Sequence, residues 1–292
     1  MSSFAERLPI LDNPRADRVR RVSGLVGRSA RIRSGLMLVE GPQAVLELVR
    51  HRPRTLRDVY VREDLWDSSP ELIASARAAT RWVHPVSQAV SAALSSDAQG
   101  VCAVASLDAL HRELPDAEVG ETLVVIAQGR DPGNVGTIIR TADAFGARAV
   151  IAVVGTVDAA SPKVVRSSAG SVFHLPVCLV PSFAEARDLI HGRGAALLGT
   201  SGGSGSLDLA DLLVEGVSSR SRLSQSHAWA FGNEARGLSA EEMRACDGLV
   251  AIPMTGRAES LNVASAAATC LFASQTVRGR TPSRPRVGGL RD

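Results

Sequence analysis

The sequence predicts an α/β protein in which a small α/β domain precedes a larger domain built on a parallel sheet. Two observations carry this prediction. Short apolar runs alternate with helical patterns beyond residue 121, and a polar stretch with Pro115 and Gly120 separates them from a shorter alternating series. The 292 residues, 45% of them hydrophobic, suffice for two folded domains. We therefore place an N-terminal domain at residues 1–105, a linker at 106–120, the larger domain at 121–280, and a disordered tail rich in Arg, Gly and Pro at 281–292.

The N-terminal domain is expected to be a short alternation of strands and helices. Its first strand, Leu36–Glu40, is an apolar run that ends at a Gly-Pro turn signal. The helix after it carries Val45, Leu46 and Val49 on one face. The expected strands are 36–40, 56–61 and 101–106, and the expected helices are 43–50 and 71–79.

The larger domain is expected to hold a sheet that is buried on both faces. The run Leu123–Ala127 is apolar at every position, which is typical of a strand covered on both sides. Because such runs alternate with helical patterns, we expect parallel strands joined by crossover helices. The expected strands are 123–127, 149–154, 195–199, 228–231 and 249–252, and the expected helices are 134–146, 162–170, 182–191 and 262–277.

Positive charge is concentrated in the N-terminal domain. The net charge is only +3, but residues 1–105 hold 15 Arg against 11 acidic residues, and residues 1–35 hold eight Arg against three. Arginine binds phosphate through two parallel hydrogen bonds and stacks on bases, so one interpretation is a surface for RNA. A solvated helical face is the other interpretation, and a GC-rich genome would also favour arginine over lysine.

Several kinds of site and location are disfavoured by the sequence. The four cysteines, Cys102, Cys178, Cys246 and Cys270, are far apart and predict buried thiols with neither a disulfide nor a zinc site. No two histidines are three or four residues apart, so we expect no metal site. No apolar run is as long as a membrane span, and the first residues lack the apolar core of a signal peptide. We therefore expect a cytoplasmic protein without a membrane partner.

The first of three polar motifs runs from Gln128 to Gly146, follows an expected strand and opens a helix. Asn134 is expected at the helix N-cap, where its side chain can accept a hydrogen bond from an orphan backbone N–H. Arg140 lies beside the apolar stripe, where it could pair with Asp143 on the surface or serve a ligand. The glycines near the helix start allow a phosphate-binding loop, but they lack the Gly-x-Gly-x-x-Gly spacing.

Two further motifs follow later strands. The segment Phe231-Gly-Asn-Glu-Ala-Arg-Gly237 follows the run at 228–231, and Glu259-Ser-Leu-Asn262 opens an Ala-rich helix. Taken singly, the glycines fit turns, the charges fit a solvated loop, and Ser260 or Asn262 fits a helix N-cap. Taken together, three polar loops at the ends of buried strands predict one small-molecule site at the carboxyl edge of the sheet.

In order and spacing, the three motifs resemble those of the SpoU (TrmH-like) family of RNA ribose 2′-O-methyltransferases, within the SPOUT superfamily. The resemblance covers roughly residues 121–278, including the stretch from Ser161 to Val177. The segment Val39–Pro42 resembles part of the RNA substrate-binding domain that precedes many SpoU catalytic domains. The resemblance implies a parallel sheet tied in a deep trefoil knot, and S-adenosylmethionine (SAM) as the methyl donor.

The resemblance also assigns residues to the site. It implies a SAM-binding set of Thr200, Ser201, Gly202, Phe231, Gly232, Ile252, Met254 and Leu261. It carries over to catalysis the polar residues Asn134, Arg140, Glu234, Ser260 and Asn262. An arginine pKa above about 12 leaves almost no neutral form to act as a base. We therefore expect Arg140 to clamp a substrate phosphate and the developing alkoxide, with Glu234 orienting Arg140 or Asn134. Ser260 and Asn262 are expected to bind the ribose or fix their loop.

The expected partners follow from the same resemblance. No metal is required, because the sulfonium of SAM already makes its methyl group electrophilic. The substrate is expected to be RNA, and rRNA in particular, because tRNA-specific relatives often lack a full preceding domain. The helix 262–277 is apolar nearly all round, and the family covers such helices across a two-fold axis, so we expect a homodimer. A tRNA methyltransferase and a non-catalytic RNA-binding relative remain as alternatives, whereas the missing glycine fingerprint disfavours a nucleotide-dependent oxidoreductase.

Overall fold

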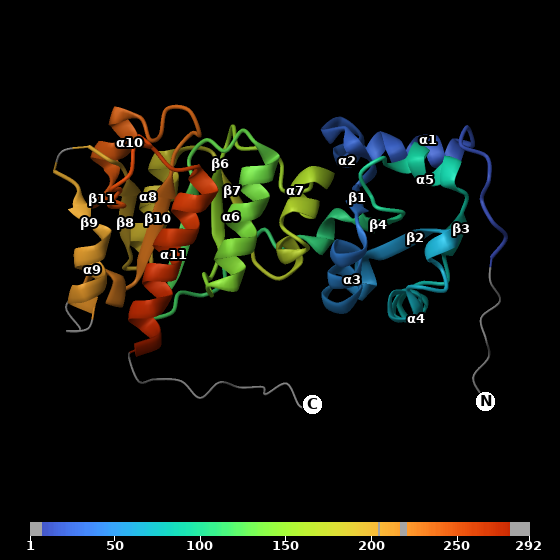
Figure 1. The fold of residues 1–292 in the computed structure, drawn as a ribbon, viewed down its shortest axis with the longest axis horizontal. Helices are drawn as coiled ribbons and strands as arrows, with labels where there is room; N and C mark the ends of the chain where they lie inside the picture. The colour runs from blue at the N-terminus through green and yellow to red at the C-terminus, as the bar shows by residue number, and fades with distance from the viewer. Residues whose placement is uncertain (1–7, 204, 217–220, 281–292) are drawn as a thin grey trace.

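Two sheets lie side by side along the long axis of the molecule (Figure 1). The structure, a computed structural model, describes residues 8–203, 205–216 and 221–280. The expected tail at 281–292 and Arg7 of the basic stretch lie outside the described residues. The smaller sheet is formed by the N-terminal strands, and the larger sheet by the strands beyond residue 121.

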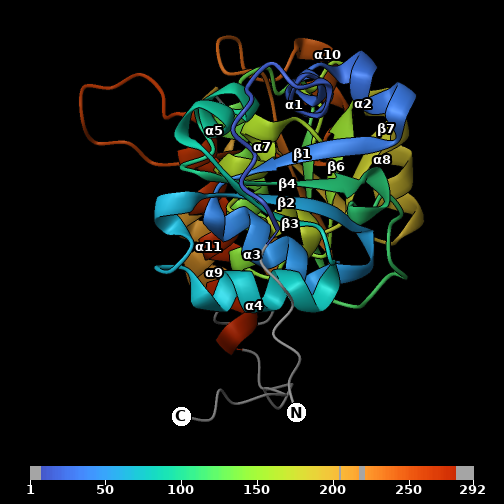
Figure 2. The same ribbon diagram turned by 90° about the vertical axis from the view of Figure 1, so that its right-hand side faces the viewer.

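The smaller sheet has the strand order β1-β4-β2-β3, with β2 and β3 parallel and the other pairs antiparallel. Its strands are β1 (Leu36–Glu40), β2 (Leu56–Arg62), β3 (Val83–Val86) and β4 (Val101–Ser106). The helices around it are α1 (Asp17–Ser23), α2 (Arg28–Ser34), α3 (Pro42–His51), α4 (Pro70–Ala79) and α5 (Gln88–Leu94). Figure 2 shows α3 and α4 on one face of the sheet and α1 and α5 on the other. Alternate residues of each strand therefore enter different cores, as Ala103 and Val104 do on β4.

The larger sheet has the strand order β7-β6-β5-β10-β8-β11-β9, and every neighbouring pair is parallel. Its strands are β5 (Thr122–Ile126), β6 (Val150–Val153), β7 (Val177–Val180), β8 (Ala196–Thr200), β9 (Leu207–Asp208), β10 (His227–Phe231) and β11 (Gly248–Ala251). The predicted parallel sheet is confirmed. β7 and β9 were not expected from the sequence, because β7 is a short run between Pro176 and Pro181 and β9 has only two residues.

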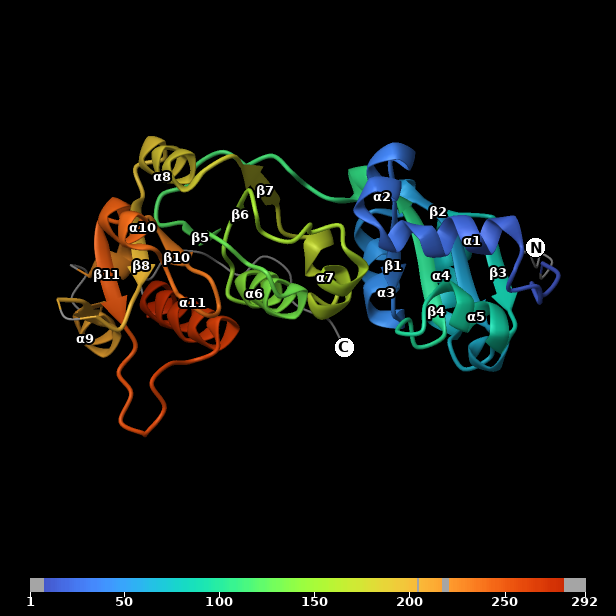
Figure 3. The same ribbon diagram turned by 90° about the horizontal axis from the view of Figure 1, so that it is seen from above.

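Helices cover both faces of the larger sheet (Figure 3). One face packs against α6 (Pro132–Ala144), α9 (Leu209–Glu215) and α11 (Val263–Arg280), and the other packs against α8 (Phe183–Gly192) and α10 (Ala240–Ala245). Short 3-10 turns occur at Gly24–Val26, Pro53–Thr55, Glu63–Leu65, Leu107–Ala109, Ser171–Phe173 and Arg222–Ser224. Within the described residues, none of the helices combines the length and apolar character that a membrane span requires.

The two parts of the molecule share a packed junction around α7 (Pro162–Ser167), which lies between the sheets in Figures 1 and 3. One apolar core continues from the α3 side of the small sheet through α7 to α6 and the larger sheet. Arg166 of α7 forms ion pairs with Glu40 of β1 and with Asp97, the latter at 2.8 Å between Nη2 and Oδ2. The side chain of Arg31 on α2 reaches across to Asp158 at 2.7 Å.

Candidate functional site

A cavity of about 410 Å3 opens at the carboxyl ends of β8, β10 and β11. These strands are neighbours in the sheet, and the chain segments that follow them approach one another at its carboxyl edge. The walls come from residues 200–202 after β8, residues 232–238 after β10, and residues 252–261 after β11. In an α/β sheet this edge is the usual place for a small ligand, because loops there present backbone groups to it.

The loop after β10 closes on itself tightly enough to require glycine. Asn233 and Gly237 exchange backbone hydrogen bonds of 3.0 and 2.8 Å, and Gly237 has a φ of +68°. A Cβ atom on Gly232 would lie 2.1 Å from the carbonyl carbon of Gly237. Only glycine fits at Gly232, because the atom in the way is backbone and cannot move aside. The loop therefore brings its peptide groups directly to the cavity wall.

Glu234 holds the backbone that leads into α6. Its Oε1 atom accepts hydrogen bonds from the amides of Arg130 and Asp131, at 3.3 and 3.1 Å. No hydrogen bond joins Glu234 to Arg140 or Asn134 in the described part of the chain, so the expected orienting contact is absent from this structure. The carboxylate instead links the second motif to the first through the chain that precedes α6.

The expected N-cap at Asn134 is wrong by one turn. Helix α6 begins at Pro132, and Asp131 is its N-cap, with Oδ1 accepting from the amide of Asn134 at 2.8 Å. Pro132 is well suited to the first helical position, where its missing N–H costs nothing, so the helix starts before the asparagine. This placement leaves the Asn134 side chain free to contact another segment.

Asn134 and Asn262 meet between the first and third motifs. The Asn262 Oδ1 atom accepts from the amide of Ala264 at 2.8 Å, so Asn262 caps α11. Its Nδ2 atom donates to the Asn134 Oδ1 atom at 3.0 Å. The capping interpretation of Asn262 is therefore confirmed, but the same side chain also joins the first turns of α6 and α11.

Arg140 lies apart from the other predicted catalytic residues. It is exposed on α6 and is not among the residues that line the cavity. Within the described residues its side chain makes no hydrogen bond or ion pair, since Asp143 instead contacts the His174 Nδ1 atom at 3.0 Å. The alternative of an Arg140–Asp143 surface pair is therefore wrong, and the guanidinium is available to a ligand.

Seven of the eight predicted SAM-binding residues line the cavity, namely Thr200, Ser201, Gly202, Gly232, Ile252, Met254 and Leu261. Phe231 does not, because it is fully buried in β10 and its carbonyl accepts from the amide of Ala127. Glu234 and Ser260 of the predicted catalytic set also line the cavity, whereas Asn134 and Asn262 do not. Met254 and Leu261 are 42% and 41% exposed, on a segment that projects from the body of the molecule in Figure 3.

Comparison with known proteins identifies this arrangement. The sequence profile described as the SpoU rRNA Methylase family matches residues 121–272. This chain belongs to the SpoU rRNA methylase family. A second profile, described as RNA 2′-O ribose methyltransferase substrate binding, matches residues 38–108, the region of the small sheet.

Full-length SpoU relatives are similar to almost the whole chain. The 23S rRNA (guanosine-2′-O-)-methyltransferase RlmB of Bordetella pertussis is 34% identical over 244 residues, which are 81% of this chain and 96% of that protein. The 23S rRNA (uridine(2479)-2′-O)-methyltransferase of Streptomyces viridochromogenes is 35% identical over 277 residues, 89% of this chain and 90% of that protein. The crystal structure of the SpoU methyltransferase AviRb from Streptomyces viridochromogenes in complex with AdoMet, which is SAM, matches with a TM-score of 0.74 and 31% identity, over 92% of this chain and all of that one.

Part of this SpoU site was not found from the sequence. The additional lining residues are Asn233, Ala235, Arg236, Gly237, Leu238, Met243, Val250, Glu259, Val263 and Ala266. Most of them lie within or beside the motifs, so the motifs themselves were the available signal. Met243 is different, because it reaches the cavity from α10 through tertiary packing that no local pattern indicates.

A second cavity, of about 320 Å3, lies at the junction of the two parts of the SpoU chain. Its walls include Arg28, Arg31 and Arg112 together with Asp158 and apolar residues of β5, β6 and α6. Arg31 is 3% exposed and is held by the carbonyls of Leu25 and Val26 as well as by Asp158. None of the loops after β8, β10 and β11 reaches this cavity, so it is not the candidate cofactor site.

Three of the four cysteines match the expectation of buried thiols, and Cys246 is only partly buried. All four are free, and Cys102, Cys178 and Cys270 are buried. Burial raises the pKa of Cys246, the thiol nearest the loops of the site, to about 12, with nearby Asp247 acting in the same direction. A thiol with such a pKa stays protonated at neutral pH and is a poor nucleophile.

Proposed function

We propose that this protein transfers the methyl group of SAM to a ribose 2′-hydroxyl of RNA, with rRNA as the substrate. The observation that carries the proposal is the cavity at the ends of β8, β10 and β11, which the second and third motifs line together with the loop after β8. Membership of the SpoU family, the 23S rRNA activities named for its relatives and the AdoMet bound to AviRb support it. The trefoil knot that the family resemblance implies belongs to the same proposal.

The proposed chemistry needs positioning and charge stabilisation. SAM brings an electrophilic methyl group, and the enzyme has to hold the 2′-oxygen in line with it, which can lower the barrier by roughly 7–11 kcal/mol. In this proposal Met254 and Leu261 pack the adenine and methionine portions of SAM, while the peptide groups around Gly232 hydrogen-bond to its polar atoms. No step requires a metal ion at this cavity.

The polar residues receive roles that fit their positions. Ser260 contacts the ribose, because it lines the cavity on the projecting segment. Asn134 and Asn262 fix the starts of α6 and α11, since their side chains are joined to each other. Glu234 fixes the chain at Arg130 and Asp131. Arg140, whose guanidinium has no partner among the described residues, contacts the substrate phosphate and the developing alkoxide.

Titration calorimetry with SAM and transfer of labelled methyl groups to rRNA test the proposal. We expect one SAM per chain, binding that persists in the presence of a metal chelator, and label recovered as 2′-O-methylated ribose. An rRNA fragment and a tRNA pool, compared side by side, distinguish the proposed substrate from the tRNA alternative. SAM binding without transfer to any RNA would favour the non-catalytic alternative, and absence of SAM binding would refute the proposal.

We also propose a homodimer formed through the exposed side of α11. Most of the apolar residues of this helix are buried within the protomer, including Cys270 and Leu271, so these residues do not themselves require cover from a second copy. The exposed positions Ser265, Thr269 and Gln275 are polar, but Phe272 is 55% exposed and packs edge-on against Phe145. A large exposed aromatic side chain is a plausible centre for an interface between two copies.

Substitution of Phe272 tests the homodimer. Phe272→Glu should yield monomers and weaken SAM binding, because the family places its dimer interface beside the cofactor. Light scattering and SAM titration measure the two effects, and Val214→Glu, at an exposed position on α9, is the matched control. Leu271 is unsuitable as a probe, because a charge at a fully buried position would unfold the protomer. A wild-type protein that is monomeric at micromolar concentration and fully active would contradict the proposal.

A further inference from the structure

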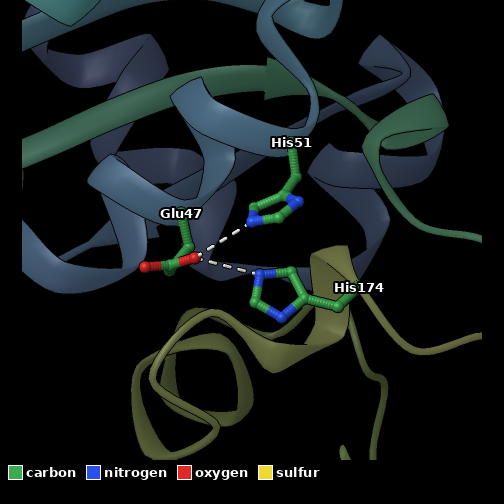
Figure 4. Close-up of side chains that lie close together, drawn as sticks. All are labelled: Glu47, His51 and His174. Carbon is green, nitrogen blue, oxygen red and sulfur yellow. Dashed lines mark hydrogen bonds and ion pairs between the residues drawn. The ribbon is translucent and has the colours of Figure 1, made fainter. Parts of the chain in front are cut away.

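Three side chains with metal-binding atoms converge at the junction between α3 and the segment after α7 (Figure 4). Glu47 and His51 lie one turn apart on α3, and His174 follows the 3-10 turn Ser171–Phe173. The Nε2 atoms of His174 and His51 lie 3.0 and 3.3 Å from the same oxygen, Oε2 of Glu47. All three ligand atoms lie within 4.8 Å of one another.

Two of the three spacings among these atoms match edges of the tetrahedron that ligand atoms form around a small cation. A Zn²⁺ ion bound at about 2.0–2.1 Å by nitrogen and oxygen holds its ligand atoms about 3.3 Å apart. The two distances to Glu47 Oε2 are close to this value. Two imidazoles and one carboxylate also form a common protein ligand set for zinc, with the fourth position left to water.

The second carboxylate oxygen of Glu47 already has partners. Glu47 Oε1 accepts from Gln43 at 3.0 Å and from Arg50 at 3.3 Å, which leaves Oε2 to the two histidines. The charge of Arg50 is also shared with Glu71, at 2.5 Å. Glu47 is therefore oriented for binding through one oxygen, with its other oxygen fixed by the same helix.

His174 faces a carboxylate oxygen with each ring nitrogen. Its Nδ1 atom lies 3.0 Å from Asp143 Oδ2, and its Nε2 atom lies 3.0 Å from Glu47 Oε2. A neutral imidazole has only one N–H, so donation to Asp143 leaves a lone pair at Nε2 that points at Glu47. A cation bound by both His174 Nε2 and Glu47 Oε2 would remove the repulsion between their lone pairs. Donation of the second ring N–H to a carboxylate is also the usual support for a metal-binding histidine.

The backbone brings the two halves of the cluster together. Gly170, with a φ of +91°, passes so close to α3 that a Cβ atom there would lie 2.6 Å from the Glu47 Cβ atom. Arg52, just beyond α3, donates from Nε to the carbonyl of Phe173 at 3.2 Å. His174 is thereby held next to α3 by contacts that do not depend on the cluster itself.

We propose that Glu47, His51 and His174 bind a divalent transition-metal ion, with zinc best suited to these ligands, and that the ion links the substrate-binding and methyltransferase parts of the chain. His174 comes from a segment remote in sequence from Glu47 and His51, which is why histidine spacing alone predicted no such site. The cluster shares no residue with the cofactor cavity, so the ion serves the junction and takes no part in methyl transfer.

Titration of metal-free, full-length protein with Co²⁺ tests the site, followed by displacement with Zn²⁺. We expect one ion per chain, the visible absorption bands of four-coordinate Co²⁺, and a rise in the unfolding temperature on adding Zn²⁺. His51→Gln and His174→Gln should each weaken binding at least tenfold and abolish the bands. The matched control is His191→Gln, which removes an exposed histidine that pairs with Asp247, away from the cluster.

Asp143→Asn supplies a second measurement, because it removes the partner of His174 and leaves all three ligands in place. We expect weaker binding with the Co²⁺ bands retained. Equal metal affinity in the wild type, the two cluster variants and the control would overturn the proposal, as would an absence of the bands in the wild type. In that case the three side chains are held together by their hydrogen bonds alone. SAM binding should be unchanged by metal removal, so this test is independent of the proposed methyl transfer.

Discussion

The exposed side chain of Arg140 on α6 has no hydrogen-bonding partner among the described residues. The start of α6 is joined to the second motif through Glu234 and to the third through Asn262. We predict that Arg140→Ala leaves SAM affinity within a few-fold and lowers methyl transfer by about 10²-fold, the scale of losing one group that stabilises transition-state charge. Arg140→Lys should recover only part of the rate, because lysine keeps the charge without the planar pair of donors.

Calorimetry with SAM and single-turnover methyl transfer measure the two effects of Arg140→Ala. Arg187→Ala, at a surface position on α8, is the control and should change neither quantity. If SAM affinity and turnover fall together, Arg140 supports the cofactor site or the fold, and the proposed role is wrong.

His227 is a buried histidine whose charge the fold does not accommodate. Its Nδ1 atom lies 2.8 Å from the Gln225 carbonyl and its Nε2 atom 2.8 Å from the Ser274 hydroxyl. Burial lowers the pKa of His227 from 6.5 to about 4, with nearby Arg278 adding to the shift and the hydrogen bond at Gln225 opposing it. Between these two values the unfolded chain binds a proton that the folded chain does not.

We therefore predict that stability is lost as the pH falls from about 6.5 towards 4, with a loss of about 3 kcal/mol from this residue over the whole window. Above pH 6.5 His227 is neutral in both states and contributes no pH dependence. Urea unfolding at pH 7, 6 and 5 measures the effect, and His227→Gln should flatten it while keeping an acceptor for the Ser274 hydroxyl. An identical pH dependence in the variant would show that other groups cause the loss.

Among the elements, long apolar runs were predictable and short or mixed ones were not. β5, β6 and β10 follow from apolar runs that are buried throughout, where residue type alone specifies burial. β8 and β11 follow from similar apolar runs, although both are only partly buried. β3 was missed because it contains His84 and Pro85, which are buried by contacts from distant segments. α1 and α2 were missed because their arginines conceal a stripe of only a few buried residues, such as Val19 and Val22.

Among the site residues, too, some could be predicted from the sequence and others could not. Residues that touch the cavity through loop backbone were predictable, because motif order and spacing specify where the loops leave the sheet. Phe231 does not line the cavity because it still belongs to β10, so its part in SAM binding stays a prediction. The partners of Glu234 and Asn134 could not be predicted, since they depend on how the start of α6 packs against two other loops.

Four arginines on or just before helices α1 and α2 are exposed. Among the described residues, their side chains form neither a hydrogen bond nor an ion pair. They are Arg15, Arg21, Arg28 and Arg33. Arg18 and Arg31 differ, because they contact His84 and Asp158. The unpaired arginines are the ones that an RNA backbone could reach without breaking a contact in the protein.

We predict that replacing Arg21, Arg28 and Arg33 by alanine weakens RNA binding and reduces its salt dependence. Each phosphate contact with single-stranded RNA contributes about 0.7 to the slope of log affinity against log salt, so the slope should fall by about 2. Filter binding at several salt concentrations measures it, with SAM titration as the check on folding. An unchanged slope would mean that this surface does not contact RNA.

At the scale of the whole molecule, the Glu40–Arg166 ion pair joins the two domains. Glu40 lies in the part that matches the substrate-binding profile, and Arg166 lies in the part that matches the methylase profile. The side chain of Glu40 is 6% exposed and also accepts from Ser95 at 2.7 Å, whereas that of Arg166 is 28% exposed. Removal of Arg166 leaves a buried carboxylate without its cation. We predict that Arg166→Met destabilises the protein by about 3 kcal/mol, the lower end of the range for such pairs, because water still reaches the site.

A double-mutant cycle tests the pair. Glu40→Gln should recover more than half of the loss caused by Arg166→Met, because it removes the uncompensated charge while keeping an acceptor for Ser95. Urea unfolding of the wild type, the two single variants and the double variant gives the coupling energy. Strict additivity of the two substitutions would show that the ion pair does not stabilise the junction.

The pairing of β5 with β10 has a consequence for how the chain folds. Thr122 lies opposite His227 in the sheet, so one edge of β5 has no partner until a hundred further residues have been synthesised. Contacts so distant in sequence form slowly, because the loop between them must be closed first. During translation β5 and β6 therefore present an apolar edge that other chains can join. We expect the cofactor cavity to form late, after the carboxyl-terminal strands have inserted, which makes SAM binding a reporter of completed folding.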